Sequence, residues 1–130
     1  MSEMKVSLSV SKVDFRGNTG DKMQYFYVFS RETCILTKET TSLIFEFSES
    51  TSENFKIEKL YFTDDGYKIL GKSLIDTNGR AVVISEINKV EKRLVVTSVL
   101  CSYTHEKDGK QYTNYLNCDP QVLNDPDIIT

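Results

Sequence analysis

The sequence predicts an all-β protein, an immunoglobulin-like antiparallel β-sandwich of about eight or nine strands. Residues 1–130 are expected to form a single domain. Valine and isoleucine together occur 20 times in the 130 residues, whereas alanine, the strongest helix former, occurs once. Asp-Gly and Asn-Gly pairs separate several of the β-type runs. The chain lacks the tryptophan and the cysteine pair of true immunoglobulin domains, so only their architecture is predicted.

Four strands are predicted in the first half of the chain. The first alternates between apolar and serine side chains, which is typical of a half-buried strand, and a turn-rich loop follows at 14–21. The second is apolar on both faces, which favours a central strand or a covered outer face. In the fourth, Leu43, Phe45 and Phe47 share one face. These strands cover residues 5–13, 23–29, 33–37 and 41–47.

Residues 55–62 have two interpretations. Ser50 and Glu53, in the polar loop 48–54, have the spacing of a capping box that would begin a helix. As a strand, the same run needs a bulge near Glu58 to keep its apolar residues on one side. The strand is favoured because residues 63–66 follow and have the composition of a hairpin turn.

The second half continues as strands joined by tight turns. A two-residue loop at Asp108-Gly109 would pair Lys107 with Lys110, and it would bring Cys101 diagonally close to Cys118. Residues 119–130 contain both prolines and are expected to form an extended C-terminal tail or edge segment. The predicted strands cover residues 67–75, 81–87, 93–103 and 112–118.

Charge and hydropathy argue against two classes of partner. The net charge is −3 and the isoelectric point about 5.2, and basic residues do not cluster, so nucleic-acid binding is not expected. The N-terminus lacks the apolar stretch of a signal peptide, and no run is long enough to span a membrane. We therefore expect a cytoplasmic protein with no membrane partner.

The sequence contains no catalytic motif that we recognise. It has neither a glycine-rich phosphate loop nor a G-x-S-x-G elbow. Its one histidine, His105, is expected to be solvated next to a turn. Its three cysteines lack C-x-x-C spacing and are expected to be buried thiols. We therefore predict no enzyme activity, no catalytic residue, no metal and no cofactor.

Two weaker signals remain open. Asp119, Asp125 and Asp127 lie near Asn117 and Asn124 and could supply oxygen ligands to calcium, although EF-hand spacing is absent and Asp-Pro favours turns. Seven tyrosines could form a stacking surface for a sugar or a protein, or could simply fill the sheet.

The stretch 115–126 resembles the C-terminal sequence of a known protein family. It reads Tyr-Leu-Asn-Cys-Asp-Pro-Gln-Val-Leu-Asn-Asp-Pro and resembles the C-terminal signature of the DP-EP family, small uncharacterised bacterial proteins named after two acidic-Pro dipeptides. Here the second dipeptide is Asp125-Pro126 in place of Glu-Pro. The resemblance implies an immunoglobulin-like sandwich in a bacterial cytoplasm and supplies no activity. The ending is also similar, more faintly, to bacterial inclusion-body proteins.

The first functional hypothesis is a non-enzymatic module that binds another protein or its own copy, because no catalytic constellation is found and residues 23–29 have two apolar faces. The alternative is a small-ligand or carbohydrate-binding protein, or a hydrolase, that uses tyrosines together with Asp119 and Asp125. The candidate binding residues are Tyr115, Asp119, Pro120, Asp125 and Pro126.

Overall fold

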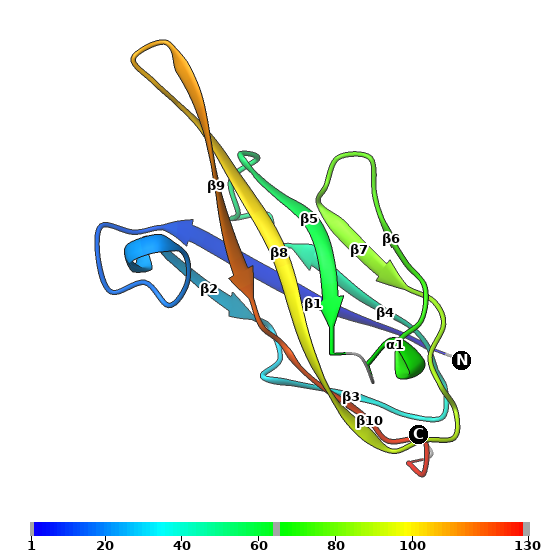
Figure 1. Ribbon diagram of the computed structural model, residues 1–130. Coiled ribbons are helices and arrows are strands. Elements are labelled where there is room, and N and C mark those ends of the chain that lie inside the picture. Colours follow the sequence, from blue (N-terminus) through cyan, green and yellow to red (C-terminus); the bar gives the residue numbers. More distant parts are fainter. Residues whose placement is uncertain (1, 64–65, 129–130) are drawn as a thin grey trace.

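Two five-stranded sheets pack face to face in the computed structural model, which describes residues 2–63 and 66–128 (Figure 1). The first sheet has the order β2 (Tyr25–Phe29), β1 (Ser2–Lys12), β4 (Thr40–Phe47), β7 (Ala81–Ile84), β6 (Ser73–Ile75). The second has the order β3 (Thr33–Leu36), β10 (Gln121–Asn124), β8 (Arg93–Lys107), β5 (Phe55–Phe62), with β9 (Lys110–Cys118) also paired to β8. The prediction of an all-β sandwich is confirmed.

The core forms where the alternating apolar side chains of the two sheets meet. On β1, Val6, Leu8 and Val10 are buried while the serines between them face outward, as the alternation predicts. Phe45 of β4 and Phe55 of β5 are among the largest fully buried side chains. Burial of these side chains away from water is the main force that holds the sheets together.

The sheets are mixed, although the sequence predicts purely antiparallel pairing. Strand β1 pairs in parallel with β4, and β3 pairs in parallel with β10. The cause is the route of the chain, which leaves the first sheet after β2, forms β3 in the second sheet and returns as β4. Strand β4 therefore runs in the same direction as β1.

Strand β2 lies at the edge of its sheet and its outer face is exposed, so neither the central position nor the covered face predicted from its two apolar faces is found. Met23 belongs to a short 3-10 helix, η1 (Asp21–Met23), and the outward side chains Phe26 and Val28 are exposed. The free edge is closed by Asn18, whose Nδ2 donates to the Tyr27 carbonyl (2.9 Å) and whose Oδ1 accepts from the Tyr27 N–H (2.8 Å). One side chain thus replaces a neighbouring strand at this position.

The predicted strand 67–75 is wrong in its first part. The chain forms a helical turn, α1 (Gly66–Ile69), and only then β6, which pairs with β7 instead of β5. Ile69 and Leu70 are consecutive and both fully buried, and a helical turn can bury both where a strand would expose one. Residues 64–65, the centre of the expected turn 63–66, lie outside the described residues, and β7 ends at Ile84, before the predicted end at 87.

Strand β5 confirms the strand interpretation of residues 55–62 and its bulge. Ile57 faces Cys101 and Lys59 faces Leu100, so the register shifts between them by one residue. The bulge keeps Leu60 buried on the same side as Ile57.

Strands β9 and β10 are two parts of one strand. Val99 faces Cys118, and Val96, three residues earlier, faces Gln121, three residues later, so the register on β8 does not change. Between them Pro120 lies level with Thr97 and has no N–H to donate, which interrupts the ladder. The segment 119–130 is therefore not the expected edge tail, because β10 lies between β8 and β3.

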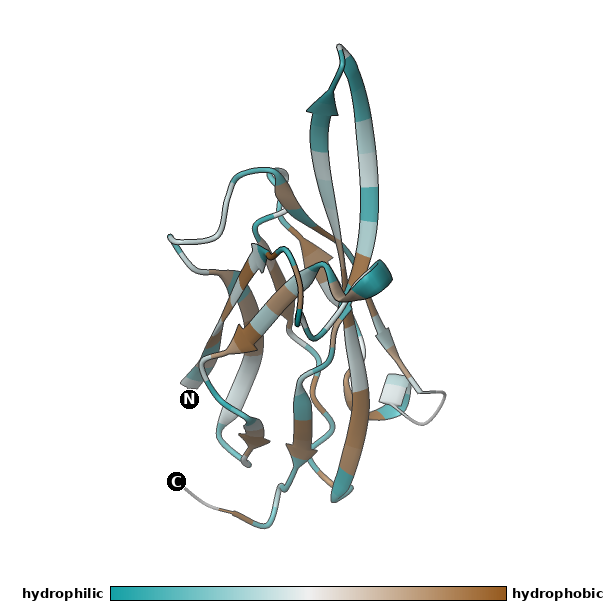
Figure 2. Ribbon diagram, turned by 90° about the vertical axis from the view of Figure 1, so that its left-hand side faces the viewer, coloured by the Kyte–Doolittle hydropathy of each residue, from teal (hydrophilic) through white to brown (hydrophobic). Residues whose placement is uncertain are grey.

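The β8–β9 hairpin extends beyond the sandwich, and its tip is polar (Figures 1 and 2). Lys107 pairs with Lys110 around Asp108 and Gly109, which have φ of 55° and 76°, the signature of a type I′ turn. The predicted register is confirmed. Strand β5 accompanies β8 only as far as Tyr103, and the Thr104 N–H donates to the Asn54 carbonyl just beyond it. We call residues 104–113 the arm.

Candidate functional site

The outer face of the second sheet carries a hollow of about 660 Å³. Alternation along β8 directs Val95 and Thr97 into the core and leaves Leu94, Val96 and Ser98 facing outward. We name this site the outer-face hollow and define it by its outward-facing residues Tyr61, Leu94, Val96, Ser98, Asn117, Asp119 and Gln121. Its volume lies within the range of ligand pockets.

The floor of the hollow is apolar and exposed. Leu94 is 61% exposed and Val96 64% exposed, although both lie in the first part of β8, which is paired with β10. Ile35, on β3, is also exposed and lies in line with Leu94 through Leu123 of β10. Contiguous apolar side chains of this kind on a sheet face mark an interaction surface.

Polar groups from all five strands of the second sheet surround this floor. The Ser98 hydroxyl donates to Asn117 Oδ1 (3.1 Å), and the Thr33 hydroxyl donates to Gln121 Oε1 (3.1 Å). At the side near β5, the Lys59 ammonium lies 4.9 Å from the centre of the Tyr61 ring. These contacts fix the orientation of the amides and the ring at the rim.

Among residues 2–63 and 66–128, Asp119 is the one acidic residue that lines the hollow, and it is exposed. Its backbone N–H donates to the Tyr27 hydroxyl (3.2 Å), which attaches the end of β9 to β2 of the other sheet. Partial burial, reinforced by the negative charge of Asp119, raises the pKa of Tyr27, so that hydroxyl stays neutral. The hollow therefore presents an apolar floor with a carboxylate at its rim.

The structure separates the five sequence-predicted residues into two groups. Asp119 and Pro120 line the outer-face hollow, and Tyr115 lies exposed on the same face of β9, toward the arm. Asp125 and Pro126 are buried beyond the other end of β10. Asp119 and Asp125 are six residues apart along an extended segment, about 20 Å, so they do not converge as a pair of catalytic carboxylates would.

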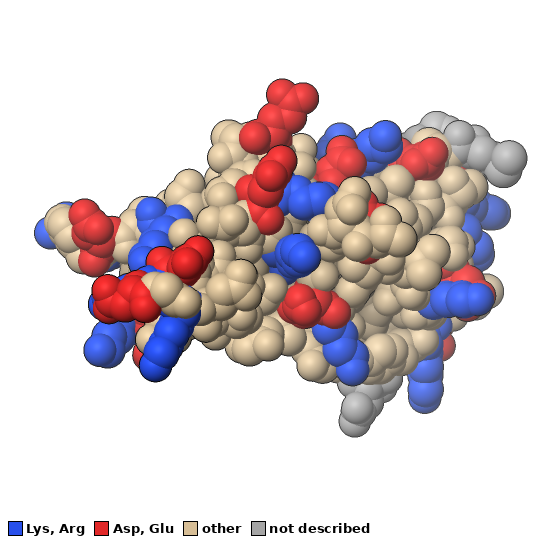
Figure 3. All heavy atoms as spheres, turned by 90° about the horizontal axis from the view of Figure 1, so that it is seen from above, with Lys and Arg blue, Asp and Glu red and all other residues tan. Residues whose placement is uncertain are grey.

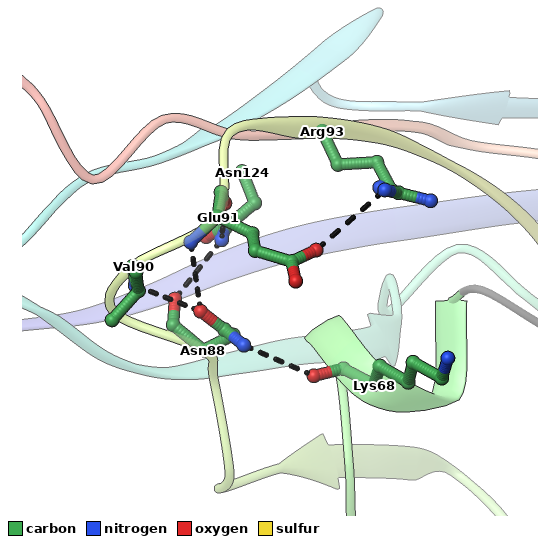
Figure 4. Close-up of polar contacts among 6 residues, drawn as sticks. All are labelled: Lys68, Asn88, Val90, Glu91, Arg93 and Asn124. Carbon is green, nitrogen blue, oxygen red and sulfur yellow. Dashed lines mark hydrogen bonds and ion pairs between the residues drawn. The ribbon is translucent and has the colours of Figure 1, made fainter.

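Asp125 and its neighbour Asn124 hold a loop in place. Asp125 accepts from the Asp127 N–H and lies 3.5 Å from the Lys92 ammonium. Asn124 Nδ2 donates to the carbonyls of Asn88 (2.9 Å) and Glu91 (2.8 Å), as Figure 4 shows. The end of β10 is thereby tied to the connection between β7 and β8, which is a structural role.

The three cysteines are free and buried, as predicted. Burial raises the pKa of Cys34 to about 11. A hydrogen bond with Cys101, together with burial, raises the pKa of Cys118, which confirms that these two thiols are neighbours across the hairpin. Thiols with raised pKa values are poor nucleophiles at neutral pH.

His105 is half-buried, whereas the sequence predicts a solvated side chain. Its ring stacks on Tyr103 (centroids 5.5 Å apart, 22° between planes) and lies 5.7 Å from Tyr112 across the hairpin. The cause is cross-strand pairing, since His105 faces Tyr112. These rings continue the aromatic core from Phe55 into the arm.

Sequence reasoning missed the floor of the hollow. Leu94, Val95 and Val96 are three consecutive apolar residues, so a strand must direct some of them away from the core. That run is the signal that could have found Leu94 and Val96. Tyr61 carries no comparable signal, because an isolated outward tyrosine is ordinary on a sheet.

Charges do not add a further site on the face that bears the arm. Acidic and basic side chains are interspersed there, without a large area of one sign (Figure 3). Within residues 2–63 and 66–128, no three His, Cys, Asp or Glu side chains are grouped so that they could hold a metal ion. No helix in this part of the chain has the length and apolar character needed to cross a membrane.

The chain matches no model of a known protein family, and no curated protein is similar to it. The function of the candidate site is therefore inferred from its geometry and chemistry.

Proposed function

We propose that this protein is a non-enzymatic binding module that recognises a partner protein through the outer-face hollow. The observation that carries the proposal is the exposure of Leu94 and Val96 beside the Asp119 carboxylate on a rigid, paired strand. A binding site on a sheet is held more precisely than one on a loop.

The chemistry of the hollow indicates the kind of partner segment that fits it. The apolar floor suits an aliphatic or aromatic side chain, whose burial would supply most of the affinity. Asp119 is the only charged residue among the described residues that line the hollow, and it would complement a Lys or Arg placed next to that anchor. The partner segment is therefore an apolar residue flanked by a basic one.

A cytoplasmic location is part of the same proposal. Three buried cysteines that are all free are typical of proteins kept in a reducing compartment. Membership of the DP-EP family, from the resemblance at 115–126, also stays a proposal, and it supplies no activity.

Selection of peptides from a random displayed library against the immobilised full chain tests this function. Enriched peptides should carry an apolar residue next to Lys or Arg. Val96→Asp should weaken their binding at least tenfold, because it places a charge in the apolar floor, and Asp119→Asn should weaken it several-fold and reduce its salt dependence.

The matched control is Leu74→Asp. Because Leu74 is 73% exposed and lies on the other sheet, this substitution should leave peptide binding unchanged. Failure to enrich any sequence would contradict the proposal, as would peptides that bind the Val96→Asp protein as tightly as the original chain.

A further inference from the structure

Strand β9 presents backbone groups that have no strand to pair with. In a hairpin closed by a two-residue turn, the flanking pair Lys107–Lys110 is hydrogen-bonded, and bonded residues then alternate along the ladder. Even-numbered residues of β9 therefore bond to β8, while Gln111, Thr113 and Tyr115 direct their N–H and C=O groups outward. The contact from the Thr19 hydroxyl to the Asn117 carbonyl follows the same alternation.

Other edge positions, on β2, on β5 and on the lower part of β9, are covered by local contacts. Asn18 closes β2 at Tyr27. Along β5, the Ile57 N–H donates to the Gly79 carbonyl, and Arg80 donates to the Phe55 carbonyl (3.1 Å). The lower part of β9 is covered at Asn117 by Thr19. In the described part of the chain, no such contact reaches the outward backbone groups of residues 111–115.

This open stretch also lacks the usual features that protect an edge strand. Residues 111–115 contain no proline and no charged side chain, and the register with β8 is regular from residue 110 to 118. Three of the five, Tyr112, Thr113 and Tyr115, are strong strand formers. The arm is therefore suited to accept a further strand.

The length and position of the open edge favour pairing with the same strand of a second copy of the protein. The edge runs from Gly109 in the turn to Tyr115, beyond which Thr19 covers Asn117, and its midpoint is Tyr112. Antiparallel pairing about a two-fold axis at Tyr112 aligns Gln111 with Thr113 of the second copy. The turn of each copy then ends beside Tyr115 of the other, before the covered part begins.

The side chains agree with this register. The two copies of Tyr112 would form a non-hydrogen-bonded pair, in which side chains lie closest, and each already packs against a His105 ring. Lys110 would face the neutral Asn114 of the second copy, so like charges are not opposed. Tyr112 is 45% exposed and can therefore be reached by a second copy.

We propose that two copies of this protein associate through the arm, by antiparallel pairing of their β9 edges into one sheet across the dimer. The inference is independent of the outer-face hollow. Since short strands joined edge to edge bury less surface than a standard interface of about 1,600 Å², the dimer should be weak and reversible.

Sedimentation velocity of the full chain over a range from about 10 μM to 1 mM tests the proposal, because this range covers weak association. A concentration-dependent dimer is expected, with amide exchange of Gln111 and Thr113 slowing as the concentration rises. Thr113→Pro removes an N–H that faces outward and should weaken the dimer at least tenfold. Tyr112→Lys places two ammonium groups at the axis and should do the same without altering the backbone.

Leu94→Asp is the matched control, since it alters the outer-face hollow and should leave dimerisation unchanged. Unaltered urea midpoints show that each variant is folded. A monomer at every concentration overturns the proposal, and so does a dimer that survives both arm variants. A dimer lost with Leu94→Asp but kept with Thr113→Pro also overturns it, because the interface would then be the outer face.

Discussion

The two halves of the long hairpin share one register but differ in their surroundings. In the root, which comprises residues 93–103 and 114–124, β5 and β3 flank the strands and the inward side chains are buried. In the arm, residues 104–113, no further strand flanks the pair and most side chains are exposed. The turn determines which residues pair, whereas packing determines which part of the hairpin stabilises the fold. The arm is thus free to take part in binding.

The largest expected contrast between the halves is in stability. Leu116→Ala in the root removes a buried side chain from the core and should lower the free energy of unfolding by about 2–5 kcal/mol. Tyr112→Ala in the arm should lower it by less than about 1 kcal/mol, because that side chain is half-exposed. Urea denaturation measures both, and equal losses would contradict the distinction.

A smaller loss of stability is expected from a substitution at Asn124, the last residue of the root. Asn124→Ala removes two hydrogen bonds from buried Nδ2 to the carbonyls of Asn88 and Glu91 and should cost about 1–3 kcal/mol. Amide exchange should accelerate in the loop around residue 90 and not in the arm. Asn114→Ala is the control, since it removes a single bond to the Tyr25 hydroxyl and should cost less.

High pH should destabilise the sheet beside the root through the buried thiol of Cys34 on β3. The raised pKa of Cys34 means that the unfolded chain loses this proton before the folded chain does. Stability should therefore be unaffected below the ordinary thiol pKa of about 8.5 and fall as the pH rises from there through about 11. Urea midpoints from pH 7 to 11 measure this, and a Cys34→Val protein should show a shallower fall.

The smallest effect is expected at the tip of the arm. Gly109→Ala places a Cβ at a φ of 76°, where it meets no atom within 4 Å, so the cost is conformational and about 1 kcal/mol. Gly79→Ala has a similar φ of 68°, but its Cβ would lie 3.0 Å from Lys56 Cβ. Urea denaturation should show the larger loss for the Gly79 variant, and the reverse order would contradict this account.

Local signals made much of the fold predictable. The two-residue turn at Asp108-Gly109 determined the register of β8 and β9, and strict alternation identified the inward residues of β1 and β4. The position of β10 was not predictable in the same way. It depends on β3, where Gln121 meets Thr33, 88 residues earlier in the chain. The helical turn α1 was missed because its burial depends on the rest of the core.

The site was predicted only in part, for a related reason. Asp119 and Pro120 were predicted as binding residues and do line the hollow, whereas Asp125, predicted with them, lies elsewhere and holds a loop. Alternation shows that Leu94 and Val96 share a face, but whether that face is covered depends on the whole molecule. The alternation of apolar residues therefore predicts which side chains of a sheet face the core better than it predicts which outward side chains form a binding site.

The closed edge of β2 depends on a single side-chain amide. Asn18 uses both ends of its amide on Tyr27, one as donor and one as acceptor. Deamidation to aspartate would replace the Nδ2 donor with an oxygen that faces the Tyr27 carbonyl, so attraction would become repulsion. The edge beside the exposed Phe26 and Val28 would then open to another chain. Loss of this one amide group would thus turn a protected edge into one that another chain could pair with.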